Sequence, residues 1–179
     1  MENLLSHYKS TIIPALKTQF GYSNVFEIPR MMKVTLNVGV GRNAKEANFI
    51  ESVEKTLRAI TGQKPVRTKA KKSVAGFKIR EGQVVGVMVT LRKKRMNDFV
   101  EKLIHYTLPR VRDFRGIDSS IVDGHGNLNL GFKEHISFPE VGSDEIDRVH
   151  GLELSITSTA KTHEEGVALF KAMGFPFKS

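Results

Sequence analysis

One turn in the sequence has the glycine spacing that holds a nucleotide phosphate. Gly39-Val40-Gly41 ends an alternating segment, and Ala44 completes the G-x-G-x-x-A pattern of a dinucleotide-binding turn. Such a turn follows a strand that is buried on both faces and precedes an acidic residue by about twenty positions. Here the preceding segment has a polar face, and residues 60–63 contain no acid. We therefore prefer the interpretation that these glycines let a strand leave its sheet, and a nucleotide-binding enzyme is the alternative.

Histidines and acids, which could supply a metal site or acid–base catalysis, are scattered along the chain. No pair of histidines has the spacing of metal ligands, and the sequence contains no cysteine. No Ser/His/Asp or paired-carboxylate arrangement stands out. The sequence therefore predicts no catalytic residue, no metal and no cofactor. Four histidines are interpreted as surface or contact residues: His125, His135, His150 and His163.

The basic residues, in contrast, are concentrated. Residues 64–95 hold eleven of the 28 lysines and arginines and one of the 19 acids, Glu81, so this stretch carries the whole excess of the +9 net charge. A charge cluster is often only a solvated surface, but one that collects the entire surplus favours a polyanionic partner. A membrane-surface role would need an amphipathic helix, which this glycine- and serine-containing segment does not predict.

Within that stretch, cations alternate with small residues and one aromatic on a predicted protruding loop. Lys71 and Lys72 precede Ser73-Val74-Ala75-Gly76, and Phe77, Lys78 and Arg80 follow. Lysines in such a loop neutralise phosphates, and Phe77 could stack on a base or sugar. The alternative is that Phe77 anchors the loop to the core.

Periodic patterns in the sequence predict the helices and strands that must position this loop. Apolar spacing predicts helices over residues 5–20, which Pro14 bends or splits, 50–60 ending at Gly62, 96–109 stopping at Pro109, and 163–173 closed by Gly174. Strict alternation predicts half-buried strands over 33–40, 85–92, 127–132 and 152–157, with a weaker one at 65–69. Residues 80–83 are predicted to be a turn joining two arms of a hairpin within residues 77–84.

Half-buried strands need helices over their apolar faces, so the sequence predicts an α+β fold. We expect two layers, with a mostly antiparallel sheet, helices on one face and an open face opposite. Such a face is either plain solvated sheet or a surface for nucleic acid, because small hydroxyls and amides reach phosphates, sugars and base edges. The residues expected there are polar and mostly uncharged: Lys33, Thr35, Asn37, Thr90, Arg92, Asn127, Asn129, Ser155 and Thr157.

Length and composition bound the class of protein. The 179 residues, 40% of them hydrophobic, suit one domain spanning 1–179, and no repeat or linker marks a boundary. No apolar stretch approaches the roughly 18 residues that span a bilayer. The absence of cysteine agrees with a cytoplasmic protein without disulfides.

One long segment of the sequence resembles a known protein family. Residues 57–80, LRAITGQKPVRTKAKKSVAGFKIR, closely resemble the signature of bacterial large-subunit ribosomal protein five, the 5S rRNA-binding family. The resemblance covers nearly the whole chain, and motifs of this length and order are specific. Further matches are Ile28–Arg30, Leu36–Gly41, Val89–Arg92, Pro109–Gly116, Asp123–Asn127, Phe138–Glu140, Thr159–Lys161 and Gly174–Phe177.

The resemblance implies an α+β domain whose concave sheet surface binds 5S rRNA and helps to attach it in the central protuberance. The expected partners are 5S rRNA, P-site tRNA, large-subunit rRNA, neighbouring 5S-binding ribosomal proteins and a small-subunit head protein; no membrane is expected, and the protein would be a monomer within the ribosome. Family motifs and the open face together predict these rRNA-binding residues: Lys33, Thr35, Asn37, Gln63, Thr68, Thr90 and Arg92. The loop 71–82 would contact P-site tRNA through Lys71, Lys72, Phe77, Lys78 and Arg80.

An intersubunit bridge is also implied by the resemblance. It is assigned to the loop 110–118 and to a segment near 138–147, with Arg110, Arg112, Phe138 and Asp144 as its residues. The acidic residues 144–147 suit a basic partner protein or a solvated loop. Where this chain has His125 the family usually has arginine, which puts a fixed cationic contact there in doubt, and Lys93-Lys94 makes the segment after its strand more basic than is common.

Overall fold

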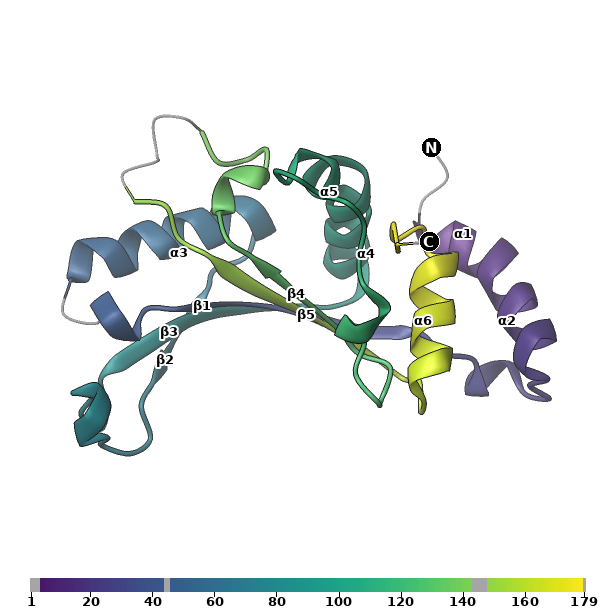
Figure 1. Ribbon diagram of the computed structural model, residues 1–179, viewed down its shortest axis with the longest axis horizontal. Coiled ribbons are helices and arrows are strands. Elements are labelled where there is room, and N and C mark those ends of the chain that lie inside the picture. Colours follow the sequence, from purple (N-terminus) through teal and green to yellow (C-terminus); the bar gives the residue numbers. More distant parts are fainter. Residues whose placement is uncertain (1–3, 44–45, 143–147, 179) are drawn as a thin grey trace. The chain divides into compact units, whose positions relative to one another are not determined.

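The computed structural model describes residues 4–43, 46–142 and 148–178 (Figure 1). It confirms the predicted α+β class, with an open five-stranded antiparallel sheet in the order β2-β3-β1-β5-β4. The strands are β1 (Met31–Gly39), β2 (Val66–Lys69), β3 (Val84–Leu91), β4 (Leu128–Phe132) and β5 (Leu152–Ser158). The α-helices are α1 (Leu4–His7), α2 (Ile13–Phe20), α3 (Ala47–Thr61), α4 (Lys93–Lys102), α5 (Leu108–Arg110) and α6 (His163–Ala172).

The chain folds into two compact units, and each is built from separate stretches of sequence. The first unit comprises Met1–Val34, Leu91–Leu130 and Ser155–Ser179, and the second comprises Thr35–Thr90 and Gly131–Leu154. Strands β1, β3, β4 and β5 contribute residues to both units. One domain over the whole chain stays a prediction.

Strand alternation predicts burial correctly in both units. In β1, Val34, Leu36 and Val38 are buried while Thr35 and Asn37 between them are half-exposed. The same pattern holds in β3, where Val87, Val89 and Leu91 are buried, and in β5, where Leu152, Leu154 and Ile156 are buried. One face of the sheet is therefore core, and the other is polar.

Helix α3 covers the buried side of the second unit (Figure 1). Its residues Ile50, Val53, Leu57 and Ile60 form one buried stripe, as their spacing predicts. The helix ends at Gly62, whose φ of 64° places it in the left-handed region that favours glycine.

Two prolines lie inside helical segments of the first unit, and each is accommodated in the same way. Pro14 follows the π-helical turn Tyr8–Ile12, and Pro109 follows the π-helical turn Leu103–Thr107. A proline lacks the N–H of the regular ladder and its ring displaces the carbonyl four residues earlier, so a wider turn absorbs the mismatch. The third helical segment begins at Lys93. Because the wider turn accommodates Pro109, this segment continues to Arg110, one residue past the stop predicted at Pro109.

The β2–β3 hairpin differs from its prediction. The turn at residues 80–83 is present, with Gln83 N–H donating to the Arg80 carbonyl at 3.2 Å, but it does not join the two main arms. Those arms are β2 and β3, which pair antiparallel through Val66↔Met88 and Arg67↔Val87, with a register shift after Thr68. Residues 70–83 form an extended end to this pair, which we call the hairpin tip. The prediction failed because the pairing of β2 with β3 joins segments fifteen or more residues apart.

Candidate nucleic-acid interface

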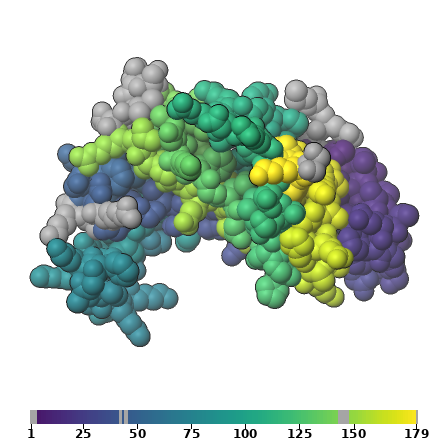
Figure 2. Space-filling model, in the orientation of Figure 1, coloured from purple at the N-terminus to yellow at the C-terminus, as the bar shows by residue number. Residues whose placement is uncertain are grey.

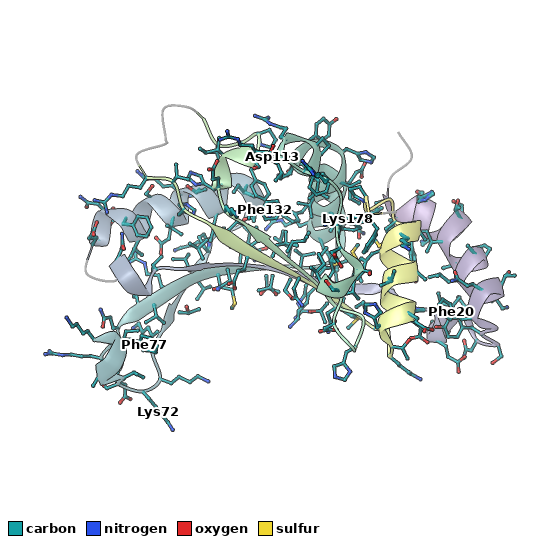
Figure 3. The ribbon with its side chains drawn as sticks, in the orientation of Figure 1. Phe20, Lys72, Phe77, Asp113, Phe132 and Lys178 are labelled. Atoms are coloured by element: carbon teal, nitrogen blue, oxygen red, sulfur yellow. The ribbon has the colours of Figure 1, made fainter. Side chains whose placement is uncertain are left out.

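The hairpin tip carries the predicted loop cations on its surface. Lys71, Lys72, Lys78 and Arg80 are all exposed, and Figures 2 and 3 show the side chains of this segment projecting from the second unit. Several like charges that lie on one short segment repel one another and attract a polyanion. The tip therefore has the electrostatics of a phosphate-binding element.

Backbone hydrogen bonds give the tip a defined shape. Val74 and Ile79 form an isolated antiparallel bridge, with N···O distances of 2.9 and 3.2 Å. Ser73 Oγ accepts from the Glu81 N–H at 2.9 Å, and Gln83 Oε1 accepts from the Arg80 N–H at 3.1 Å. These bonds fix the backbone that presents the cations, so little order has to be gained on binding.

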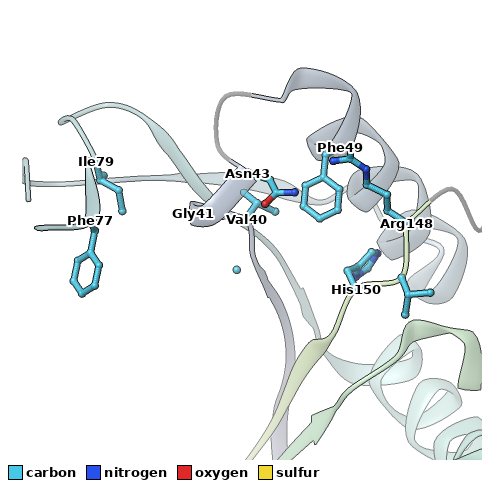
Figure 4. Close-up of a pocket in the computed structure, with 10 residues that line it drawn as sticks. Val40, Gly41, Asn43, Phe49, Phe77, Ile79, Arg148 and His150 are labelled. Carbon is cyan, nitrogen blue, oxygen red and sulfur yellow. The ribbon is translucent and has the colours of Figure 1, made fainter.

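The aromatic side chain of the tip points outward. Phe77 is 77% exposed, whereas Ile79 lies 3.8 Å from the position that a Cβ at Gly41 would occupy. Figure 4 shows both side chains beside a hollow of about 760 Å³ whose other side is formed by Val40, Gly41 and Phe49. Ile79 rather than Phe77 therefore faces the body of the unit, which leaves Phe77 available to stack on a base or sugar.

A second, uncharged feature lies on the polar sheet face of the same unit. Asn37, Thr68 and Gly86 converge there: a Cβ at Gly86 would lie 2.7 Å from Thr68 Oγ1 and 3.5 Å from Asn37 Oδ1. Only glycine leaves room for both polar groups, and this requirement was not predicted from sequence. We call the side chains around Gly86, together with Thr35, Gln63 and Thr90, the uncharged patch.

Gln63 is held at this patch by its neighbours. Its Nε2 donates to the Thr90 carbonyl at 3.1 Å, and its backbone N–H donates to Thr61 Oγ1 at 3.3 Å. Thr61 Oγ1 in turn donates to the Leu57 carbonyl at 2.6 Å at the end of α3. The end of α3 thus positions the side-chain amide of Gln63 beside β3. Side-chain amides held in this way can form hydrogen bonds with RNA.

One cation of the basic stretch is neutralised within the second unit. Arg67 on β2 forms an ion pair and two hydrogen bonds with Glu54 on α3. The hydrogen bond from Arg67 holds the pKa of the Glu54 carboxyl below its usual range. Arg67 is therefore a structural cation, and this pairing separates it from the exposed cations of the tip.

The first unit has a polar sheet face of its own. Lys33 on β1 is half-exposed, Arg92 at the start of α4 is exposed, and the Ser155 hydroxyl donates to Asn129 Oδ1 at 2.7 Å. Asn127, expected on the open face, is instead held in a turn: its N–H and its Nδ2 each donate to the Asp123 carboxylate at 2.8 Å. Burial tends to raise the pKa of Asp123, but the hydrogen bonds from Asn127 and His125 outweigh it and lower that pKa.

Two histidines interpreted as surface residues are in the core of the second unit, so that interpretation was wrong for them. His135 and His150 are buried and stacked, with ring centroids 4.1 Å apart, and the His150 N–H donates to His135 Nδ1 at 3.2 Å. Burial, and then the neighbouring His135, lower the pKa of His150 to about 4. Their contact joins residues fifteen positions apart, which periodicity does not reveal. His125 is exposed, and His163 is half-buried with its Nδ1 3.0 Å from the Val122 carbonyl.

The residues predicted for an intersubunit bridge have different positions. Arg110 and Arg112 are exposed in the first unit. Phe138 is fully buried in the second, where its ring packs on Phe132 at 5.3 Å between centroids, so this side chain cannot contact a partner directly. An aromatic residue next to a proline can be buried or exposed, so the sequence did not reveal that Phe138 is in the core. Asp144 lies outside the described residues.

The turn after β1 lacks the geometry of a dinucleotide site. That fold needs a parallel strand beside the first one after a crossover helix. Here β2, which follows α3, pairs antiparallel with β3, and β3 separates it from β1. Ala44 lies outside the described residues. Within the described ranges no group of three or more histidines and acids is placed to hold a metal ion, and no helix there is long and apolar enough to cross a membrane.

An uncharged polar patch beside an exposed cationic hairpin is typical of a nucleic-acid-binding protein and not of a catalytic cleft. Comparison with known proteins makes the assignment specific. Residues 24–80 match the model of ribosomal protein L5, and residues 84–177 match that of the ribosomal L5P family C-terminus. The chain belongs to the ribosomal protein L5 family. Members of this family are structural ribosomal proteins, so the chain is not an enzyme.

Relatives match over almost the full length. The chain is 52% identical to large ribosomal subunit protein uL5 of Trichodesmium erythraeum, over 99% of this chain and 98% of that protein. It is 51% identical to uL5 of Desulforapulum autotrophicum over the whole of both chains. It is also 51% identical to uL5c of Rhodomonas salina, over 98% of this chain and 97% of the relative.

Proposed function

We propose that this large-subunit ribosomal protein binds 5S rRNA through the uncharged patch, together with Lys33 and Arg92. The observation that carries the proposal is the convergence of Asn37 and Thr68 over Gly86, which leaves hydrogen-bonding groups on a surface without bulk. Such a surface suits a folded RNA, whose shape and sugar hydroxyls are read without deep groove contacts. The relatives' place in the large ribosomal subunit supports it.

Binding of the full-length protein to 5S rRNA and to an unrelated RNA of equal length, across a salt series, tests this proposal. We expect a preference for 5S rRNA that persists at high salt, because hydrogen bonds and shape depend less on counterion release than phosphate contacts do. Asn37→Ala should reduce the preference while changing the salt dependence little. Equal binding to both RNAs that disappears together as salt rises would contradict the proposal.

A second RNA contact is proposed for the hairpin tip, as a site for P-site tRNA. The exposure of Phe77 and the hydrogen-bonded shape of the tip favour a contact separate from the uncharged patch. Replacing Lys72 and Lys78 by alanine should then weaken binding to tRNA more than binding to 5S rRNA. Equal loss for both RNAs would assign the tip to rRNA instead.

For the bridge to a small-subunit head protein, the exposed Arg110 and Arg112 remain as candidates. Changing both to glutamate should weaken association of the two ribosomal subunits in a sedimentation assay, while 5S rRNA binding is retained. Unchanged association would remove this loop from the bridge.

A further inference from the structure

An apolar groove of about 690 Å³ lies in the first unit, and Arg92 is the one residue of its lining that is also predicted to bind rRNA. It is formed by residues 4–13, by residues 25–32, by the start of α4 and by Met173. Four of the nine large hydrophobic side chains that are exposed in the described part of the chain line it: Leu5, Val25, Phe26 and Met32. Exposed apolar side chains gathered in one hollow indicate an interaction site, whereas scattered ones do not.

The most exposed of these side chains is held in a rigid frame. Phe26 is 88% exposed, and its N–H donates to Asn24 Oδ1 at 2.9 Å, which caps the short 3₁₀ turn Val25–Glu27. Behind that turn the Tyr8 hydroxyl donates to the Pro29 carbonyl at 2.9 Å. The aromatic ring is therefore presented by a fixed backbone, which lowers the entropy lost on binding.

All charged residues that line the groove are cations. They are Lys9 and Arg30, and Arg92 and Lys93 where α4 begins. Helix α4 has no side-chain cap at Arg92 and no acid in its first turn, so its N-terminal dipole adds to the positive potential. The groove thus combines apolar surface with a rim that favours negative charge.

The lining of the groove is rich in methionine. Four of the six methionines of the chain line it: Met31, Met32, Met96 and Met173. Flexible thioether side chains adapt to inserted aliphatic or aromatic groups and are frequent at protein-binding surfaces. RNA interfaces are more polar, and bases are bound mainly on flat aromatic or guanidinium planes. The lining therefore favours a protein segment over RNA.

We propose that this groove is a docking site for an acidic segment of another protein, which inserts large apolar side chains beside Phe26 and places its carboxylates against the cationic rim. The groove lies wholly within the first unit, and the proposal does not depend on 5S rRNA binding.

Methionine methyl NMR of the full-length protein tests it with an internal control. The probe is a blocked peptide of three Glu-Leu-Leu-Glu repeats, titrated into protein that carries ¹³C-methyl methionine. We expect the methyl signals of Met31, Met32, Met96 and Met173 to shift together, while that of Met88, on β3 in the second unit, stays in place. The same peptide with every glutamate replaced by lysine should leave all of these signals unchanged.

Two phenylalanine variants, one a test and one its matched control, show whether Phe26 anchors the peptide. Phe26→Ala should weaken peptide binding about tenfold, as expected for a central anchor residue. Phe77→Ala, which removes a similarly exposed ring from the hairpin tip, should leave it unchanged. The proposal is overturned if the acidic peptide moves no groove methyl, or if the lysine peptide binds as well. It is equally overturned if 5S rRNA shifts the same methyls, displaces the peptide and loses affinity on Phe26→Ala, since the groove would then be an RNA contact.

Discussion

The hairpin tip and the uncharged patch lie in one unit and share the same pair of strands, yet they differ in how they are built. The tip is exposed, cationic and held by its own backbone hydrogen bonds. The patch is half-buried, and its groups are fixed by crowding over Gly86 and by the end of α3. Long-range attraction needs exposed charge, whereas discrimination among RNAs needs groups that cannot move. We therefore propose that the tip contributes affinity for tRNA, whereas the patch contributes specificity for 5S rRNA.

The largest effect is expected from a side chain that fills the space above Gly86 in the patch. In Gly86→Ala the new Cβ would lie 2.7 Å from Thr68 Oγ1 and 3.3 Å from the Val38 carbonyl. We expect a loss of about 1–3 kcal/mol in the free energy of unfolding, together with loss of the preference for 5S rRNA. Chemical denaturation and RNA binding measure the two effects. Gly131→Ala in β4, where a Cβ meets nothing within 4 Å, is the matched control and should change neither.

Removing charge from the tip should weaken the affinity for tRNA and leave the preference for 5S rRNA over an unrelated RNA in place. The variant Lys72→Ala/Lys78→Ala should lower the slope of log affinity against log salt by about 0.7 to 0.9 for each phosphate that is no longer neutralised. The unfolding free energy should not change, because both side chains are exposed. Lys55→Ala/Arg58→Ala removes two exposed cations from α3 in the same unit, and an equal effect from this pair would mean that only total charge matters.

A smaller effect is expected from the aromatic ring of the tip. Phe77→Ala should weaken tRNA binding by about 1 kcal/mol because the ring no longer stacks, with no change in the salt slope. Because the ring is 77% exposed, the thermal unfolding temperature should stay the same. A large drop in that temperature would show instead that Phe77 anchors the tip.

The smallest effect concerns the ion pair behind the hairpin. Glu54→Gln should lower stability slightly at neutral pH, because Arg67 then loses its charged partner. The folded-state pKa of Glu54 is below its unfolded value, so its contribution is present above the unfolded pKa and is lost as pH falls through the folded pKa. Denaturation curves of the variant and the parent should therefore converge as the pH falls below the usual pKa of a glutamate, about 4.3. A difference that persists in acid would assign the effect to packing.

The sequence by itself determined the features that depend on neighbours along the chain. Alternation in residues 33–40 and 85–92 predicted which side of each strand is buried, and the apolar stripe with Gly62 predicted α3 and its end. The concentration of cations between residues 64 and 95 and the family motifs predicted a nucleic-acid-binding ribosomal protein. These patterns can be recognised in the sequence because each is a local repeat of apolar residues or lies in one contiguous segment.

The tertiary structure alone decided the features that join distant residues. It buried Phe138 and stacked His135 on His150, paired Arg67 with Glu54, and made Gly86 the point where Asn37 and Thr68 meet. It also assembled the cationic apolar groove from four separate segments of the first unit. Spacing along a chain specifies the face on which a side chain lies, but the partner across that face depends on how strands and helices pair, which is why these contacts were not predicted.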